Sequence, residues 1–109
     1  MPLQAPVPGA APEAVVIEHL MKLQASPATE PCRGWEDTVR RARLSIKQLL
    51  EDNPSLRPTV AAVVARLVPD VREIVAAGLD RHGETPRVKL EELRYDANSV
   101  TGRFLPPME

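Results

Sequence analysis

Apolar residues first recur at helical spacing between Pro12 and about Gln24. Proline suits the first position of a helix, so this stretch predicts a helix over 12–24. The predicted buried stripe consists of Val16, Ile17, Leu20, Met21 and Leu23. Residues 1–11 are rich in Pro and Ala, carry no charge and follow no period, which predicts a flexible tail. The tract 25–34 contains prolines and a glycine, and we expect a connecting loop there.

The clearest amphipathic pattern begins at Trp35 and predicts a second helix that ends at Asp52 or Asn53. Proline at position 54 stops this helix, because the residue before a proline disfavours helical backbone angles. Charged side chains occupy most of the other faces. The continuous apolar face consists of Trp35, Val39, Ala42, Ile46, Leu49 and Leu50.

A third helix is predicted from about Leu56 to about Leu79. Ser55 is its predicted N-cap, which places Pro58 in the first turn, where its missing N–H is harmless. In the alternative, Asn53 is the cap and Pro54 takes the first position. Pro69 lies mid-run, and we expect a kink rather than an end there, because the apolar phase continues through it. The apolar face consists of Leu56, Val60, Val63, Val64, Leu67, Val71, Ile74, Val75 and Leu79.

The pattern weakens after Gly83. A short helix over 88–95 is marginal, and the segment that contains Phe104 and Leu105 is predicted to be an extended strap packing back onto the helices. The fold class that follows is all-α: a small bundle of three main helices, with a kinked long third helix and an irregular C-terminal strap. The expected organisation is a tail over 1–11, a helical domain over 12–83 and a C-terminal extension over 84–109.

Composition adds constraints of its own. Of the 109 residues, 43% are hydrophobic and only 3% aromatic, which favours an aliphatic helical core. The net charge of −1 gives no general attraction to nucleic acid or acidic membranes. A single cysteine, Cys32, together with an N-terminus that does not resemble a signal peptide, predicts a cytoplasmic protein. We expect no membrane association, because no apolar run reaches the roughly 18 residues of a membrane span.

The stretch from Trp35 to Leu56 resembles the domain of unknown function 29 family, a set of small bacterial proteins. The family pattern pairs a tryptophan-led helix with a following Pro-Ser-Leu junction. Residues 17–24 look like the family's preceding helix, and the proline-bounded C-terminal segment also resembles it. The matching positions are Trp35, Thr38, Val39, Arg43, Ile46, Leu49, Leu50, Pro54, Ser55 and Leu56.

This resemblance implies an all-helical bundle and brings no catalytic residues. Family members usually carry further helical sequence before the first matching helix, whereas an uncharged Pro/Ala tail stands here. We therefore expect the chain to complete its bundle with a copy of itself or with a partner protein.

Candidate chemistry is sparse. Cys32 and His19 are a conceivable thiol–imidazole pair, but no spacing positions them and no third group orients them. Neither these residues nor His82 share a ligand spacing such as C-x-x-C, so no metal, cofactor or enzymatic activity is expected. An inert loop cysteine and a histidine at a helix C-terminus explain them adequately.

Two surfaces remain as functional hypotheses. The leading one is a non-enzymatic protein-interaction face formed by Trp35, Val39, Ile46 and Leu50. The alternative is a nucleic-acid face on one side of the same helix, formed by Arg40, Arg43 and Lys47. Acidic residues bracket this basic cluster and no aromatic residues interleave it, so a solvated surface is the preferred interpretation.

Overall fold

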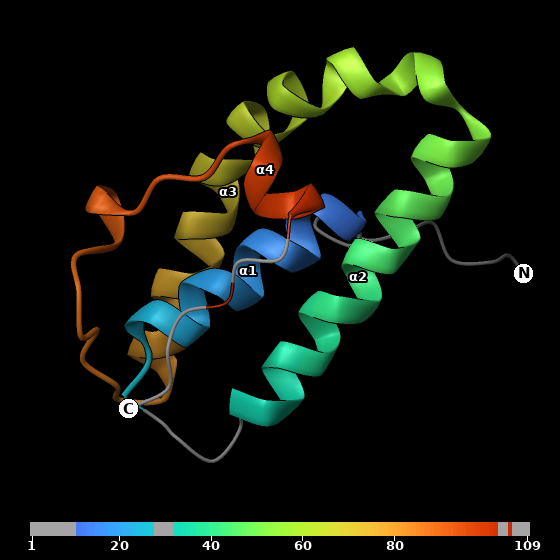
Figure 1. Ribbon diagram of the computed structural model, residues 1–109. Coiled ribbons are helices and arrows are strands. Elements are labelled where there is room, and N and C mark those ends of the chain that lie inside the picture. Colours follow the sequence, from blue (N-terminus) through green and yellow to red (C-terminus); the bar gives the residue numbers. More distant parts are fainter. Residues whose placement is uncertain (1–10, 28–31, 103–104, 106–109) are drawn as a thin grey trace, which may run out of the picture.

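The computed structural model describes residues 11–27, 32–102 and 105 (Figure 1). This part of the chain is helical and contains no strand, which confirms the predicted all-α class. Residues 1–10 of the predicted tail, loop residues 28–31 and Phe104 of the predicted strap lie outside the described residues. The elements are α1 (Pro12–Ala25), α2 (Cys32–Asp52), the 3-10 helix η1 (Pro54–Thr59), α3 (Val60–Arg81), the 3-10 helix η2 (Leu90–Glu92) and α4 (Ala97–Thr101).

Helix α1 is the centre of the fold. It packs against both α2 and α3, whereas α2 and α3 barely contact each other. Figure 1 shows α1 lying between them, with the short α4 over it. Because two helices and α4 cover it, α1 buries a wider surface than the predicted stripe. The buried residues of α1 are Ala14, Val16, Ile17, Leu20, Met21, Leu23 and Ala25.

Helix α2 begins at Cys32, ahead of the predicted start at Trp35. Its buried face follows the predicted period through Val39, Ile46 and Leu50. Leu49 was predicted on that face but lies at its edge with 39% of its surface exposed. The face of α2 that meets α1 is therefore narrower than the apolar pattern of its sequence.

The junction after α2 corrects the predicted cap. Asn53, not Ser55, precedes the next helical segment, and Pro54 takes its first position. The segment is a 3-10 helix, in which the backbone N–H of Leu56 donates to the carbonyl of Asn53 at 2.9 Å. All of η1 is exposed, so water can satisfy the carbonyl that Pro58 leaves without a backbone donor. With Asn53 as the cap, Pro58 would cost a backbone hydrogen bond only if a regular α-helix began at this point.

Helix α3 stays continuous through Pro69, as predicted. Figure 1 shows its path changing direction along its length, as expected where a proline removes a backbone hydrogen bond. Its buried residues are Val60, Val64, Val71, Val75 and Leu79. Ile74, predicted on this face, is 47% exposed, whereas its neighbour Val75 is buried.

The C-terminal extension packs onto the helices through defined contacts. Instead of the marginal helix over 88–95, the structure has the short η2, whose Leu90 is buried. Helix α4 was not predicted. It begins with a capping box, in which the Asp96 carboxylate accepts from the Ser99 N–H at 3.0 Å and the Ser99 hydroxyl accepts from the Asp96 N–H at 2.9 Å. Val100 is fully buried, and Leu105 packs against the core.

Candidate binding surfaces

The structure divides the predicted interaction face. Val39, Ile46 and Leu50 are buried in the chain's own core, where no partner can reach them without opening the fold. Trp35 alone reaches the surface: it is half-buried and packs against the edge of the core. Any interaction through this side of α2 therefore depends on Trp35 and on its neighbours from other helices.

Trp35 lies beside a surface groove, here called the Trp35 groove, with a volume of about 210 Å³. One wall comes from the start of α2 and the other from the C-terminal half of α3, including the exposed Ile74. The end of α1 supplies Lys22, whose ammonium lies 5.9 Å from the centre of the indole ring. The same ammonium pairs with the carboxylate of Glu18 at 2.9 Å. The groove therefore combines an aromatic edge, an apolar wall and a neutralised ion pair.

A serine, a glutamate and a histidine also line this groove, a set of residue types found in hydrolases. The hydroxyl of Ser26 donates to the carboxylate of Glu84 at 2.8 Å. In a nucleophilic serine the hydroxyl faces an imidazole, and the carboxylate orients that imidazole. Ser26 is buried and bonded directly to the carboxylate, while His82 caps the end of α3. This bond is better explained as a tie between α1 and the segment after α3.

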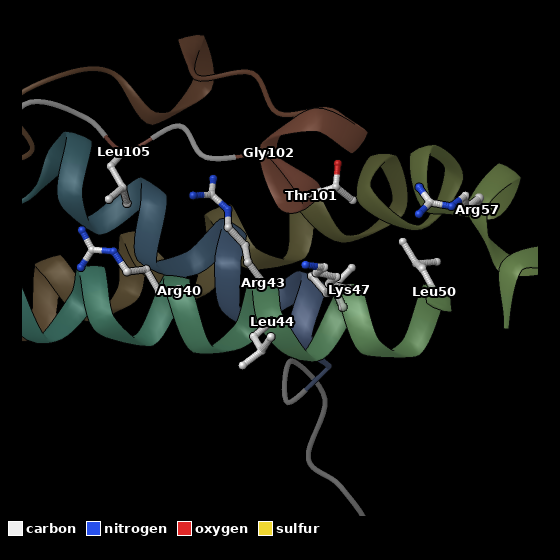
Figure 2. A pocket seen from close by; sticks show the side chains of 10 residues that line it. Arg40, Arg43, Leu44, Lys47, Leu50, Arg57, Thr101, Gly102 and Leu105 are labelled. Atoms are coloured by element: carbon white, nitrogen blue, oxygen red, sulfur yellow. The ribbon is translucent and has the colours of Figure 1, made fainter. Parts of the chain in front are cut away.

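The three residues of the predicted nucleic-acid face come together at a second, larger hollow. Arg40, Arg43 and Lys47 project from α2 on the same side, and Arg57 of η1 reaches in from the end (Figure 2). The turn after α4 closes the far side with Gly102. The hollow has a volume of about 630 Å³ and is here called the basic hollow. Its lining residues are Arg40, Arg43, Leu44, Ile46, Lys47, Leu50, Arg57, Thr101, Gly102 and Leu105.

Arg43 is the fixed cation of the basic hollow. Its Nη2 donates to the carbonyl of Ser99 at 2.7 Å, which anchors the guanidinium to α4. Its Nε–H is buried and has no hydrogen-bond partner among the described residues. Burial lowers the pKa of the Arg43 guanidinium from its usual value, because removal from water disfavours the charged form.

Arg40 and Lys47 are freer than Arg43, since both lie exposed on α2. Arg40 pairs with Asp37 at 3.5 Å, but both side chains are largely exposed, so the pair is weak. The predicted basic residues therefore differ in mobility. The fold holds Arg43 in place, whereas Arg40 and Lys47 can adjust at the rim of the hollow.

The remaining candidates of the sequence do not assemble. His19 donates from Nδ1 to the carbonyl of Val15 at 2.9 Å, within its own helix. Cys32 begins α2, and its side chain is outside what the structure describes. In the described part of the chain, no three His, Cys, Asp or Glu side chains gather in a way that would hold a metal ion. Across the same residues, no helix has the length and apolar character that crossing a membrane requires.

Comparison with protein families gives one result. The model of the family described as domain of unknown function DUF29 matches residues 13–94. The chain belongs to this family. Comparison with curated proteins and with solved structures finds no match.

The geometry explains what several motif positions do in this DUF29 chain. Val39, Ile46 and Leu50 hold α2 against α1, and Arg43 holds α2 to α4. The hydroxyl of Thr38 donates to the carbonyl of Gly34 at 2.9 Å within the first turns of α2. The motif on α2 is thus explained by packing and by local hydrogen bonds.

Sequence reasoning missed the part of the basic hollow that lies outside α2. Arg57, Gly102 and Leu105 reach it from η1 and from the turn after α4. The positions of Gly102 and Leu105 depend on α4, and the spacing of Asp96 and Ser99 was the local signal of a capping box that could have revealed this helix. Ile74 was missed as a surface residue because it belongs to an otherwise apolar helix face.

Proposed function

We propose that this DUF29 protein is a non-enzymatic interaction module that pairs with a second copy of itself through the Trp35 groove. The observation that carries the proposal is the exposure of Ile74, 47% of whose surface is accessible, opposite the half-buried Trp35. Helices α2 and α3 flank α1 without packing on each other, which leaves this side of α1 only partly covered. A helical surface that joins the two flanks would complete the bundle.

The charges around the groove favour a second copy as the occupant. A two-fold interface places the same patch against itself, so it must carry both signs of charge. The groove is lined by the acids Glu18 and Glu84 and by the bases Lys22 and Arg81. The net charge of −1 adds little repulsion between two copies. The single cysteine also supports our proposal that the protein works in the cytoplasm.

The test is the mass of the protein in solution, measured by light scattering over a concentration series. We expect a dimer, and we expect the Ile74→Asp variant to be a folded monomer, because a buried unpaired carboxylate opposes association. Val88→Asp is the matched control: Val88 is also exposed but does not line the groove, so this variant should remain dimeric. A monomeric wild type that binds no hydrophobic dye contradicts the proposal, as does an Ile74→Asp variant that still dimerises.

The chain's single tryptophan gives a second readout. Dilution of the dimer should expose the indole of Trp35 to water and shift its emission to longer wavelength. The same dilution should not change the emission of Ile74→Asp. An emission that is independent of concentration in the wild type would place the interface elsewhere.

Nucleic-acid binding through Arg40, Arg43 and Lys47 is the second candidate, supported by their meeting at one hollow. It predicts retention on DNA or RNA that falls with added salt and with Arg40→Ala and Lys47→Ala. The lack of any retention at low salt would rule it out. Its support is the weaker, because Arg43 is tied to Ser99 and the described residues that line the hollow include no aromatic side chain for base stacking.

A further inference from the structure

We propose that the basic hollow binds a small ligand that carries a phosphate or carboxylate group on a short apolar body. This surface is distinct from the Trp35 groove, and the inference does not rest on self-association. The hollow's volume of about 630 Å³ falls within the range of small-molecule pockets, which is about 300–1,000 Å³. It is bounded on one side by α2 and on the other by the end of α4 (Figure 2).

The positive charge of the hollow is local. Four of its lining residues are cations, and no Asp or Glu is among the described residues that line it. The chain as a whole carries a net charge of −1, so this concentration does not follow from its composition. Asp37 offsets Arg40 only weakly, through an exposed pair at 3.5 Å. An anionic group is therefore the chemistry that the walls recognise.

The floor of the hollow is apolar. Ile46 and Leu50 line it but are almost fully buried, so the half-buried Leu105 supplies the apolar surface that a ligand can cover. Covering an apolar floor with a hydrocarbon group removes it from water, which inorganic phosphate alone cannot do. The combination of cationic walls and an apolar floor thus favours a ligand with both parts.

Arg43 supplies an anchor that does not have to be ordered on binding. Its bond to the Ser99 carbonyl holds the guanidinium in the wall, while Arg40 and Lys47 can adjust around the anionic group. A side chain fixed in advance loses less conformational freedom when the ligand binds. The unpaired Nε–H shows that the hydrogen-bonding capacity of this guanidinium is incompletely used by the described residues.

The shape of the hollow favours a small ligand over nucleic acid. It is a recess between α2 and the end of α4, not a protruding helix that could enter a groove of DNA. Among the lining residues that the structure describes, none is an aromatic that could stack on the bases of a single strand. Nucleic-acid binding is accordingly a competing outcome of the test.

The experiment titrates the full chain with hexyl phosphate and with hexanoate, followed by calorimetry and by backbone-amide NMR. At least one ligand should bind and shift the amides of Thr101 and Gly102, while the indole signal of Trp35 stays in place. Whichever of the two binds more tightly identifies the head group. Inorganic phosphate and hexanol, which each lack one part of the ligand, should bind at least about tenfold more weakly.

Variants decide whether the hollow is responsible. The double variant Arg40→Ala, Lys47→Ala should lose about tenfold or more in affinity, because two charge contacts are removed from exposed positions that do not hold the fold. Arg41→Ala is the matched control: Arg41 lies on the same helix, is also exposed and does not line the hollow, so the affinity of this variant should be unchanged. The proposal is overturned if neither ligand binds, or if inorganic phosphate or hexanol binds as tightly as the complete ligand. It is also overturned if the double variant binds as tightly as the wild type. Displacement of the ligand by an oligonucleotide at a concentration below that of the ligand would show that the hollow binds nucleic acid instead.

Discussion

The Nη2 of Arg43 donates to the carbonyl of Ser99 at 2.7 Å and so ties the middle of α2 to α4. Helix α4 contacts all three main helices, although it is only five residues long. The family match ends at residue 94, before this helix begins. The bond therefore makes a segment beyond the matched region part of the fold.

Replacing Arg43 with Met should remove this tie while keeping much of the apolar stem. We expect a loss of about 1–3 kcal/mol in the free energy of unfolding, because a hydrogen bond from a charged donor is lost and a carbonyl loses its partner. Urea denaturation followed by circular dichroism measures this loss. Arg41→Met on the exposed side of α2 should change stability by no more than about 0.5 kcal/mol. Equal effects of the two variants would show that the bond to Ser99 contributes nothing.

Arg72 should hold the extension to α3 in a similar way. Its Nε donates to the carbonyl of Leu90 at 3.1 Å, and its Nη2 donates to the carbonyl of Leu93 at 3.2 Å. Arg72→Lys cannot form both bonds, since lysine lacks the planar fork of arginine. We expect faster hydrogen exchange in residues 88–95, with little change in α1. Unchanged exchange in this segment would assign its order to Leu90 and other packing contacts.

The presence and order of the three main helices follow from the local sequence pattern. Proline at the start of α1, the apolar period of α2 and the unbroken phase through Pro69 each act within a few residues. The central position of α1 in the bundle cannot be predicted from its own sequence. Its sequence shows one stripe, and only the packing of two helices and α4 explains why residues such as Ala14 and Leu23 are also buried.

The candidate surfaces likewise combine features that the local sequence shows with features that only the packing of the helices creates. The basic side of α2 is visible in the sequence, because Arg40, Arg43 and Lys47 recur at helical spacing. The hollow that they line depends on Gly102 and Leu105, which come from a turn with no period of its own. Trp35 was predicted to begin a packing face, yet its exposure depends on how far α3 lies from α2. Distances between helices are set by the whole core, so local pattern cannot supply them.

Gly102 is the position where an added methyl group should do most harm. An ideal Cβ there would lie 2.7 Å from the backbone carbonyl oxygen of Asn98, the same atom that accepts a hydrogen bond from the Gly102 N–H at 2.8 Å. Gly102→Ala must shift the end of α4, and we expect a loss of about 1–3 kcal/mol in stability on denaturation. Gly34→Ala is a control with the opposite sign: a Cβ there meets nothing within 4 Å, and alanine in a helix gains about 0.5–1 kcal/mol over glycine.

The burial of Tyr95 should make the stability of the protein depend on pH in the alkaline range. Its hydroxyl donates to the side-chain oxygen of Gln24 at 2.5 Å, joining the C-terminal extension to α1. Burial raises the pKa of the Tyr95 phenol above its ordinary value, and the positive charge of Arg72 opposes this only in part. The neutral form is favoured in the folded state, so the contribution of Tyr95 is fully present below about pH 10, the pKa of an exposed tyrosine. Above that pH the unfolded chain ionises first and stability falls, by at most about 1.4 kcal/mol per pH unit.

The measurement is simple because Tyr95 is the only tyrosine in the chain. Phenolate absorbance of the native protein should rise at a higher pH than that of the urea-unfolded chain. Tyr95→Phe should be less stable at neutral pH by about 0.5–1.5 kcal/mol, since the bond to Gln24 is lost. The difference between wild type and variant should then shrink above pH 10, because the variant has no phenol to ionise. Coincident titration of the native and unfolded protein would show that the phenol is solvated and that the bond to Gln24 does not hold the extension in place.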